Sequence, residues 1–332
     1  MGTGQVVLGI GTSHSPMLNA TVEEWARFAP RDPTLRYTDS DGEPATYETL
    51  LGRAAGRYDA ECAPEKFAAR AGAARAAIDR LAQEIAQAQL DALVVIGDDQ
   101  KELFLDTNLP GLLVYHGPTV AHCMRPPNPE WPGWFAAIQS RYYPEAGRID
   151  YPVAAPLARH LIERLVAEEF DVSIASSLPR GEGEGHAFAF VHRRLLRPEP
   201  VVPVVPVFLN TYYPPNQPTA RRCYAIGQAI RRAVESYPQP VRVGVLASGG
   251  LSHFAIDEPF DRAIIGAFRD KNAEALKSLP HRKLNSGNSE IRNWIAAAGA
   301  LERLPLQWAE YVPAYRSPAG TGTGLCFAAW RE

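Results

Sequence analysis

Residues Val6–Pro16 read VVLGIGTSHSP, an apolar run that passes directly into a turn of glycine, hydroxyl and histidine residues. A continuous apolar run without alternating polar positions is typical of a strand buried on both faces. In open α/β sheets, ligands bind beyond the carboxyl ends of such strands. The stretch therefore predicts a buried parallel strand with His14 at a ligand-binding edge.

Strands and helices are predicted to alternate along the rest of the chain. Between the strands, apolar residues recur three or four apart in segments 67–85, 157–165 and 223–234, which predicts helices. We expect an α/β fold, a single domain of residues 1–332 with a central mixed sheet flanked by helices. Pro203 and Pro206 favour an edge position or a bulge for their strand. The other predicted strands are Leu93–Ile96, Leu112–Tyr115, Val172–Ala175, Val201–Leu209 and Val243–Leu246.

Two segments fit no regular element. Residues 20–60 are polar and rich in turn residues, and they form an insertion between the first strand and the first long helix. A loop of that length is usually functional or partly disordered. Residues Met124–Trp134 carry four prolines and two tryptophans. A rigid loop that covers a pocket is one interpretation, and simple packing on the surface is the more common one.

Composition excludes several classes of protein. The 332 residues are 46% apolar and 21% charged, enough to bury a sizeable core. The net charge is −3 and the basic residues form no block, so we expect no nucleic-acid partner. No apolar run reaches 18 residues and Met1–Ile10 lacks a signal-peptide pattern, so we expect no membrane partner and a cytoplasmic location. Four scattered cysteines favour neither disulfides nor a cysteine zinc site.

Two further histidines follow predicted strands. His253 ends the segment Ser248–His253, which comes directly after the last buried run, and His186 follows the strand near residue 175. A single histidine in a turn is more often a structural group held by hydrogen bonds. Strand ends at one edge point into the same crevice, however, so His14, His186 and His253 together predict a site.

Carboxylates complete this pattern. Asp98, Asp99 and Gln100 follow the second buried run, and Glu290 opens the predicted helix that begins with Ile291-Arg292. Each acid could instead cap the segment that follows it. Two histidines and one carboxylate leave coordination positions open on a redox-active divalent metal ion. The residue types therefore indicate a metal site, with Glu290 as the candidate carboxylate ligand.

Four segments resemble one enzyme family. They are GTSHSP at Gly11–Pro16, GGLSHF at Gly249–Phe254, SGNSEIRNW at Ser286–Trp294 and NTYYPPNQPTARRCYAIGQAIRRAVESYP at Asn210–Pro238. In this order they resemble the class III extradiol dioxygenases, the family of the catalytic beta subunit of protocatechuate 4,5-dioxygenase. The resemblance extends from residue 5 to about 330 and leaves out residues 20–60. It implies an α/β enzyme that opens catechol-type rings with O2 at a non-haem Fe(II) ion.

The resemblance also implies a role for each matched residue. His14 corresponds to the first iron ligand, Glu290 to the carboxylate ligand, His253 to the acid/base histidine and His186 to a second pocket histidine. The remaining ligand of the family is a histidine in an Asn-Asp-His string, and Gln100 stands at its position. A glutamine oxygen binds Fe(II) more weakly than imidazole does. Either Gln100 takes over as a metal ligand, or Asp98 or Asp99 does.

This departure keeps two other interpretations open. One is a hydrolase or lyase that uses Mn(II), Mg(II) or Zn(II), and the other is a non-catalytic relative with a degenerate site. We favour the dioxygenase, with Fe(II) as its cofactor and Mn(II) as the alternative, and with a small aromatic substrate and O2 as its partners. Homo-oligomerisation and the need for a small helical subunit stay open. Further residues that could serve as pocket phenols, although packing explains them as well, are Tyr212, Tyr213, Tyr311 and Tyr315.

Overall fold

A mixed β-sheet forms the centre of the protein. The structure, a computed structural model, describes residues 3–179, 182–196 and 201–332. Within these residues, nine strands form one sheet in the order β11-β13-β1-β10-β4-β9-β5-β8, and β12 pairs with β13. This confirms the predicted α/β architecture. The strands are β1 (Gln5–Thr12), β4 (Ala92–Asp98), β5 (Leu112–Tyr115), β8 (Ser173–Ala175), β9 (Val204–Leu209), β10 (Arg242–Ser248), β11 (His253–Ala255), β12 (Leu306–Tyr315) and β13 (Thr321–Trp330).

Four parallel strands bring the predicted site residues to one edge. Strands β1, β10, β4 and β9 are neighbours and run parallel, whereas β13 and β5 run antiparallel to them on the two sides. Their carboxyl ends are in register, because Thr12 pairs with Ser248 and Asp98 pairs with Leu209. The segments that follow these strands therefore leave the sheet at the same edge.

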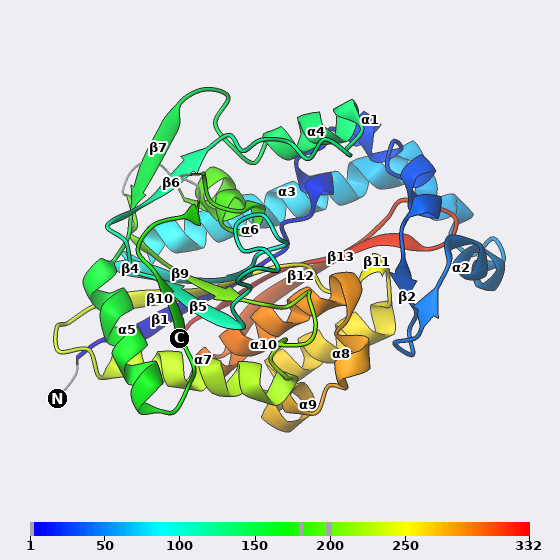
Figure 1. Cartoon of the computed structure of the whole chain (residues 1–332). Helices are drawn as coiled ribbons and strands as arrows, with labels where there is room; N and C mark the ends of the chain where they lie inside the picture. Colours follow the sequence, from blue (N-terminus) through cyan, green and yellow to red (C-terminus); the bar gives the residue numbers. More distant parts are fainter. Residues whose placement is uncertain (1–2, 180–181, 197–200) are drawn as a thin grey trace.

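Helices cover both faces of the sheet (Figure 1). Helix α3 covers one face together with α1, α4 and α6, and the other face packs against α5, α7, α8, α9 and α10. No described helix combines the length and apolar character needed to cross a membrane. The helices are α1 (Val22–Trp25), α2 (Tyr47–Ala54), α3 (Pro64–Gln87), α4 (Gly133–Ser140), α5 (Ala155–Ala167), α6 (His186–Phe190), α7 (Ala220–Glu235), α8 (Glu258–Arg269), α9 (Ala273–Lys277) and α10 (Ile291–Ala300).

The proline-containing strand does not lie at an edge, so that prediction was wrong. Strand β9 is paired with β4 on one side and with β5 on the other, and its register with β4 is continuous. Pro203 precedes the strand, and the ladder to β5 begins only at Val207, one residue after Pro206. The sheet therefore accommodates Pro206 because the pairing with β5 stops short of it.

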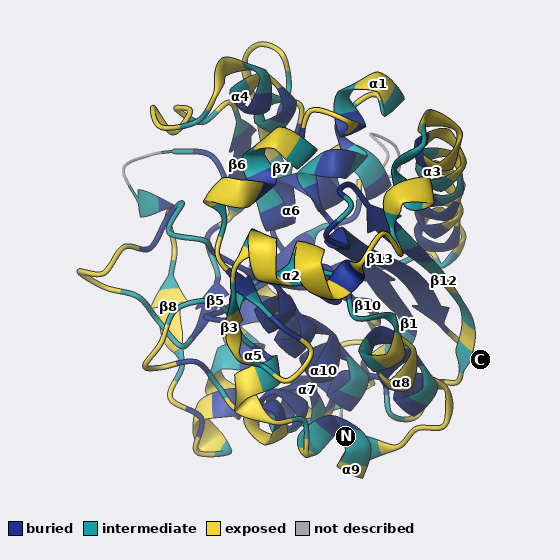
Figure 2. Ribbon diagram, turned by 90° about the vertical axis from the view of Figure 1, so that its right-hand side faces the viewer, coloured by how far each residue is buried: buried dark blue, intermediate teal, exposed yellow. Residues whose placement is uncertain are grey.

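The insertion 20–60 contains more regular structure than predicted. It holds α1, α2, the 3₁₀ turn Ala29–Thr34 and a two-stranded sheet of β2 (Tyr37–Thr38) and β3 (Pro44–Ala45). Short polar elements of this kind lack the long apolar periodicity that reveals a helix or strand in sequence. Figure 2 shows α2 as an exposed helix, whereas the strands β1, β10 and β13 are buried.

A second hairpin lies apart from the main sheet. Within the described residues, strands β6 (Thr119–Cys123) and β7 (Arg148–Pro152) form a two-stranded sheet of their own, in antiparallel register from Thr119–Pro152 to Cys123–Arg148. The chain between them includes Met124–Trp134 and the whole of α4.

Candidate active site

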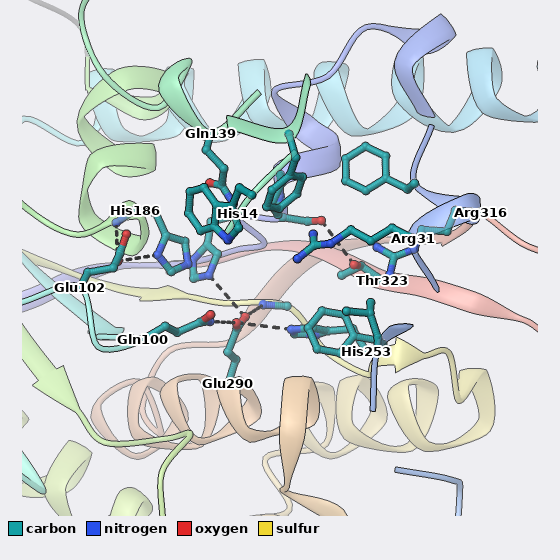
Figure 3. A pocket seen from close by; sticks show the side chains of 18 residues that line it. His14, Arg31, Gln100, Glu102, Gln139, His186, His253, Glu290, Arg316 and Thr323 are labelled. Atoms are coloured by element: carbon teal, nitrogen blue, oxygen red, sulfur yellow. Dashed lines mark hydrogen bonds and ion pairs between the residues drawn. The ribbon is translucent and has the colours of Figure 1, made fainter. Parts of the chain in front are cut away.

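A cavity of about 240 Å³ lies at the carboxyl edge of the parallel strands. His14, Gln100, His186, His253 and Glu290 all line it, whereas the alternative ligands Asp98 and Asp99 are not among its lining residues. Figure 3 shows His14, Gln100 and His253 directed at Glu290 from different elements, with His186 beside His14.

The hydrogen bonds of His14 fix its tautomer. Its Nδ1 lies 2.9 Å from Oγ of Ser248, and that hydroxyl already donates to the carbonyl of Ala187 at 2.7 Å. The imidazole must therefore donate from Nδ1, which leaves a lone pair on Nε2. Nε2 is buried and has no hydrogen-bond partner among the described residues. It faces Oε2 of Glu290 at 3.4 Å, so two electron-pair donors point at one place.

Glu290 lies at the junction of the 3₁₀ turn Ser286–Glu290 and α10, and it is 3% exposed. Its Oε2 accepts a hydrogen bond from the amide of Gly250 at 2.6 Å. A side chain at Gly249 would place its Cβ 2.9 Å from Cβ of Glu290, so glycine is needed there. Burial alone would raise the pKa of Glu290, but the neighbouring His253 holds this pKa well below its usual range. Glu290 is therefore an ionised carboxylate at the floor of the cavity.

Asp98 is the second carboxylate at this point. It ends β4, is 1% exposed and accepts a hydrogen bond from Asn293 Nδ2 at 3.2 Å. Burial and the neighbouring Glu290 raise the pKa of Asp98, because a second negative charge at this point is unfavourable. Donor atoms of His14, Asp98 and Glu290 all lie within 4.8 Å of one another.

This donor set fits a divalent metal ion. Two ligand atoms bound to one ion at about 2.1 Å are about 3.0–3.4 Å apart for angles of 90–110°. The 3.4 Å between His14 Nε2 and Glu290 Oε2 agrees with that separation. A cation would satisfy the unpartnered imidazole lone pair and offset the charges of both carboxylates.

Gln100 presents a hydrogen-bond donor to the two carboxylates. Its Nε2 lies 3.0 Å from Oε1 of Glu290 and 3.3 Å from Oδ2 of Asp98. In this arrangement the side chain bridges the two acids and does not direct its oxygen at them, so its predicted ligation remains a prediction. Asp99 turns away, because its carboxylate accepts hydrogen bonds from the amides of Leu103 and Phe104 at 2.9 and 3.0 Å. Asp99 thus has the capping role that was the alternative interpretation.

His253 begins β11 and faces the same carboxylate. Its Nδ1 donates to the carbonyl of Leu251 at 2.8 Å, so Nε2, 3.3 Å from Glu290 Oε1, is the nitrogen that can exchange a proton. Burial lowers the pKa of His253, but Glu290 raises it to a value above the ordinary one. A Cβ at Gly287 would come within 2.2 Å of the imidazole, which explains the glycine.

His186 lines the cavity, but its position in the chain differs from the prediction that it follows a strand. It is the first residue of α6, after a loop, and does not end a strand. Its ring meets that of His14 edge-on, with the centroids 4.7 Å apart. Both its Nδ1 and its backbone amide bond Oε2 of Glu102, at 2.7 and 3.0 Å. Burial opposes protonation, but Glu102 raises the pKa of His186 to about 9. Sequence reasoning missed Glu102, because its spacing from Asp98 carries no motif.

The outer part of the cavity is apolar and comes from the two irregular segments. Phe28 and Leu35 belong to the insertion, Trp131 to the segment Met124–Trp134, and Phe135 to α4. The reading of 124–134 as a loop over a pocket is therefore correct for Trp131. None of the four candidate pocket tyrosines lines the cavity among the described residues; two of them, Tyr311 and Tyr315, bond Asp261 and Glu258 instead.

Two arginines also line the cavity, on the side away from His186 (Figure 3). Arg316 forms a buried ion pair with Asp32, whose Oδ1 lies 2.6 Å from the arginine Nη2. Arg31 lies over the ring of Phe135 at 4.1 Å, and its guanidinium makes no hydrogen bond or ion pair with the described residues. Among the described residues, Arg31 is thus a cation of the cavity that forms no ion pair with an acid.

Comparison with known proteins places this geometry in a family. Residues 73–326 match the model of the catalytic LigB subunit of aromatic ring-opening dioxygenase. The chain belongs to this family. The match includes Asp98, Gln100, His186, His253 and Glu290, whereas His14 and the insertion precede it.

Individual relatives are similar over shorter stretches. The chain is 43% identical to gallate dioxygenase of Pseudomonas putida over 101 residues, which is 30% of this chain and 28% of that protein. It is 36% identical to 2,3-dihydroxyphenylpropionate/2,3-dihydroxicinnamic acid 1,2-dioxygenase of Cupriavidus pinatubonensis over 49% of this chain and 50% of the relative. The enzyme of that name from Comamonas testosteroni is 26% identical over 63% and 54%. The chain thus matches about half or less of the length of the first two relatives.

Proposed function

We propose that this protein is an extradiol ring-opening dioxygenase that cleaves a catechol-type ring with O2 at a non-haem Fe(II) ion. The metal ligands in this proposal are His14, Asp98 and Glu290. The observation that carries it is the unpartnered Nε2 of His14, which faces Glu290 at the floor of a cavity. Membership of the ring-opening family supports the choice of reaction.

When bound, a ferrous ion supplies open coordination positions and a redox partner for O2. Two carboxylates and one imidazole form a more oxygen-rich set than two histidines and one carboxylate, and such sets also suit Mn(II). Gln100 joins the two acids by its hydrogen bonds at 3.0 and 3.3 Å, which holds both in one orientation. Mn(II) is therefore the alternative metal.

His253 and His186 have different roles in proton transfer. His253 takes a proton from a substrate hydroxyl at Nε2, because its Nδ1 is held by the carbonyl of Leu251. His186 is kept protonated at neutral pH by Glu102, so its Nε2–H donates to an oxygen of the substrate. The aromatic wall formed by Phe28, Trp131 and Phe135 excludes water from its side of the cavity.

The substrate in this proposal is a single-ring catechol with an acidic substituent. The cavity of about 240 Å³ is below the roughly 300–1,000 Å³ of most small-molecule sites, which favours one ring. The relatives are named for gallate and for dihydroxyphenylpropionate and dihydroxycinnamic acid. Arg31 offers a guanidinium without an acidic partner in the described residues, the group expected opposite a carboxylate.

The test is metal analysis of anaerobically purified protein, followed by oxygen uptake with a panel of catechols. Wild-type protein is expected to hold iron at its active centre and to consume one O2 per ring opened. His14→Ala should lose this iron and all uptake, whereas the control His160→Ala, which changes a histidine on α5 that bonds Ser236, should keep both. A different metal without uptake supports a hydrolase or lyase instead. Iron retained by His14→Ala would refute the ligand assignment.

A further inference from the structure

A second group of metal-ligating side chains lies outside the active-site cavity. His122 on β6, Glu184 in the loop before α6 and His192 just after α6 have donor atoms within 4.8 Å of one another. All three are 1–3% exposed, and none lines the cavity that holds His14 and Glu290. Figures 1 and 2 both show β6, β7 and α6 grouped together.

Hydrogen bonds within the group leave a ligand atom unused. Nδ1 of His122 lies 2.8 Å from Oε1 of Glu184, and Nδ1 of His192 lies 2.7 Å from the same oxygen. Both imidazoles therefore donate to the carboxylate from Nδ1. Nε2 of His192 is buried without a hydrogen-bond partner among the described residues. This Nε2 lies on the other side of the ring from Glu184, so the atoms that a cation would bind here are the two Nδ1 nitrogens and the carboxylate oxygens.

The carboxylate also lacks a fixed positive charge. Among the described residues, its ion pairs are formed only with the two histidines. A buried carboxylate is normally paired with a cation or bound to a metal ion. The group therefore presents two imidazole nitrogens and one buried carboxylate to a cation.

The backbone around the three residues contains an uncommon helical turn and a hydrogen bond between the loop and the hairpin. His192 lies in a π-helical turn, Val191–Leu195, closed by the bond from Leu196 N to Val191 O at 3.0 Å. Such turns are rare and are frequent at functional sites. Tyr151 of β7 stacks on the His192 ring, with centroids 4.0 Å apart and planes at 13°. The amide of Glu184 bonds Ala121 O on β6 at 2.9 Å, so hairpin and loop are held in register.

We propose that His122, Glu184 and His192 form a second binding site for a divalent cation, with Zn(II) the best match. Two histidines and one glutamate are a known zinc ligand set that leaves a fourth position for water. The donor atoms, now 2.7–2.8 Å apart, would open by about half an ångström to reach the spacing of zinc ligands. The site is distinct from the active centre and does not depend on the proposed dioxygenase activity.

The position of this site gives it a role. Glu184 lies two residues before His186, and His192 lies six residues after it on the continuous helix α6 and its π turn. A cation held by both residues and by β6 would pin this segment to the β6–β7 hairpin. It would thereby fix the position of His186 without touching substrate.

The test uses metal binding in a background that lacks the active centre. After removal of metals by a chelator, His14→Ala protein is titrated with Zn(II) against a chromophoric competitor. We expect one ion per chain and a rise in the thermal midpoint. Adding Glu184→Gln should abolish both. The matched control, Glu182→Gln, changes a carboxylate of the same loop that pairs with Arg125 and should preserve both.

Two further measurements keep the result decisive. His192→Gln provides a second disrupting variant if Glu184→Gln fails to fold, as judged by circular dichroism. A crystal of Zn(II)-loaded His14→Ala protein should show an anomalous peak between His122 and His192. A folded His14→Ala protein that binds no Zn(II) overturns the proposal, as does an ion that survives both Glu184→Gln and His192→Gln.

Discussion

Replacement of Arg31 by methionine tests how the protein selects its substrate. The change keeps an unbranched apolar stem and removes a charge that lies over Phe135 and forms no ion pair with an acid in the described residues. Burial and the nearby Arg316 lower the pKa of Arg31, which shows that its charge is only partly screened by water. A substrate carboxylate would therefore gain a charge-assisted hydrogen bond at this position.

The size of the effect follows from the environment of Arg31. A hydrogen bond to a charged group contributes about 1.5–3 kcal/mol, equivalent to roughly 10–150-fold in kcat/KM. Because the guanidinium is only half-buried, the lower part of that range applies, about 10–30-fold. The loss should affect the acid alone, since a neutral ester gains nothing from the charge.

The assay compares kcat/KM for a dihydroxybenzoate and for its methyl ester by oxygen uptake. Arg31→Met should reduce the ratio of acid to ester about 10–30-fold and leave the ester nearly unchanged. Arg27→Met is the matched control, because Arg27 also belongs to the insertion and lies over an aromatic ring, Trp134, but does not line the cavity. An unchanged ratio in Arg31→Met, or an equal fall in Arg27→Met, would refute the assignment.

Three further predictions concern the centre of the site. Gln100→His should tighten Fe(II) binding, measured by competition with a chelator, because it adds an imidazole donor beside Glu290 and Asp98. Turnover need not follow, since activity also depends on how a hydrogen-bond partner orients the new ring. Weaker or unchanged affinity would contradict this. His253→Ala should retain its metal and lose at least roughly 100-fold in turnover, and normal turnover would remove His253 from the mechanism. In metal-free protein, His186 has its pKa raised from 6.5 to about 9, so its pairing with Glu102 stabilises the fold fully below about pH 6.5 and is lost as pH rises through about 9. Thermal midpoints measured from pH 6 to 10 should fall as this contribution is lost. If Glu102→Gln showed the same fall, the His186–Glu102 pair would not be its cause.

The sequence predicted those parts of the protein that depend on local apolar pattern. The runs at Val6–Ile10 and Val243–Leu246 became neighbouring strands β1 and β10, because continuous burial needs both faces covered. His14 could be placed beside Glu290 only through the family resemblance and the strand-end rule together. The structure adds what neither supplies, the tautomer of His14 and its free Nε2.

Other features depend on contacts between segments far apart in the chain. Asp99 turns to the backbone amides that follow it, whereas Asp98 turns to the centre of the site. The sequence alone cannot distinguish these orientations, because the two residues are adjacent and of the same type. Glu102 acquires its role only because the loop before His186 folds back onto it. The place of Pro206 in an interior strand likewise depends on how far the ladder of β5 extends.

The ion pair between Asp32 and Arg316 holds one wall of the cavity in place. Asp32 is fully buried and also accepts a hydrogen bond from Thr321, so the insertion is tied to the turn between β12 and β13. Removing one partner of such a buried pair costs about 3–5 kcal/mol, because it leaves the other charge uncompensated. Reactants that reach the cavity therefore meet a wall that is held in place on the side of Phe28 and Leu35, whereas residues 126–130, next to Trp131 in the other wall, are largely exposed.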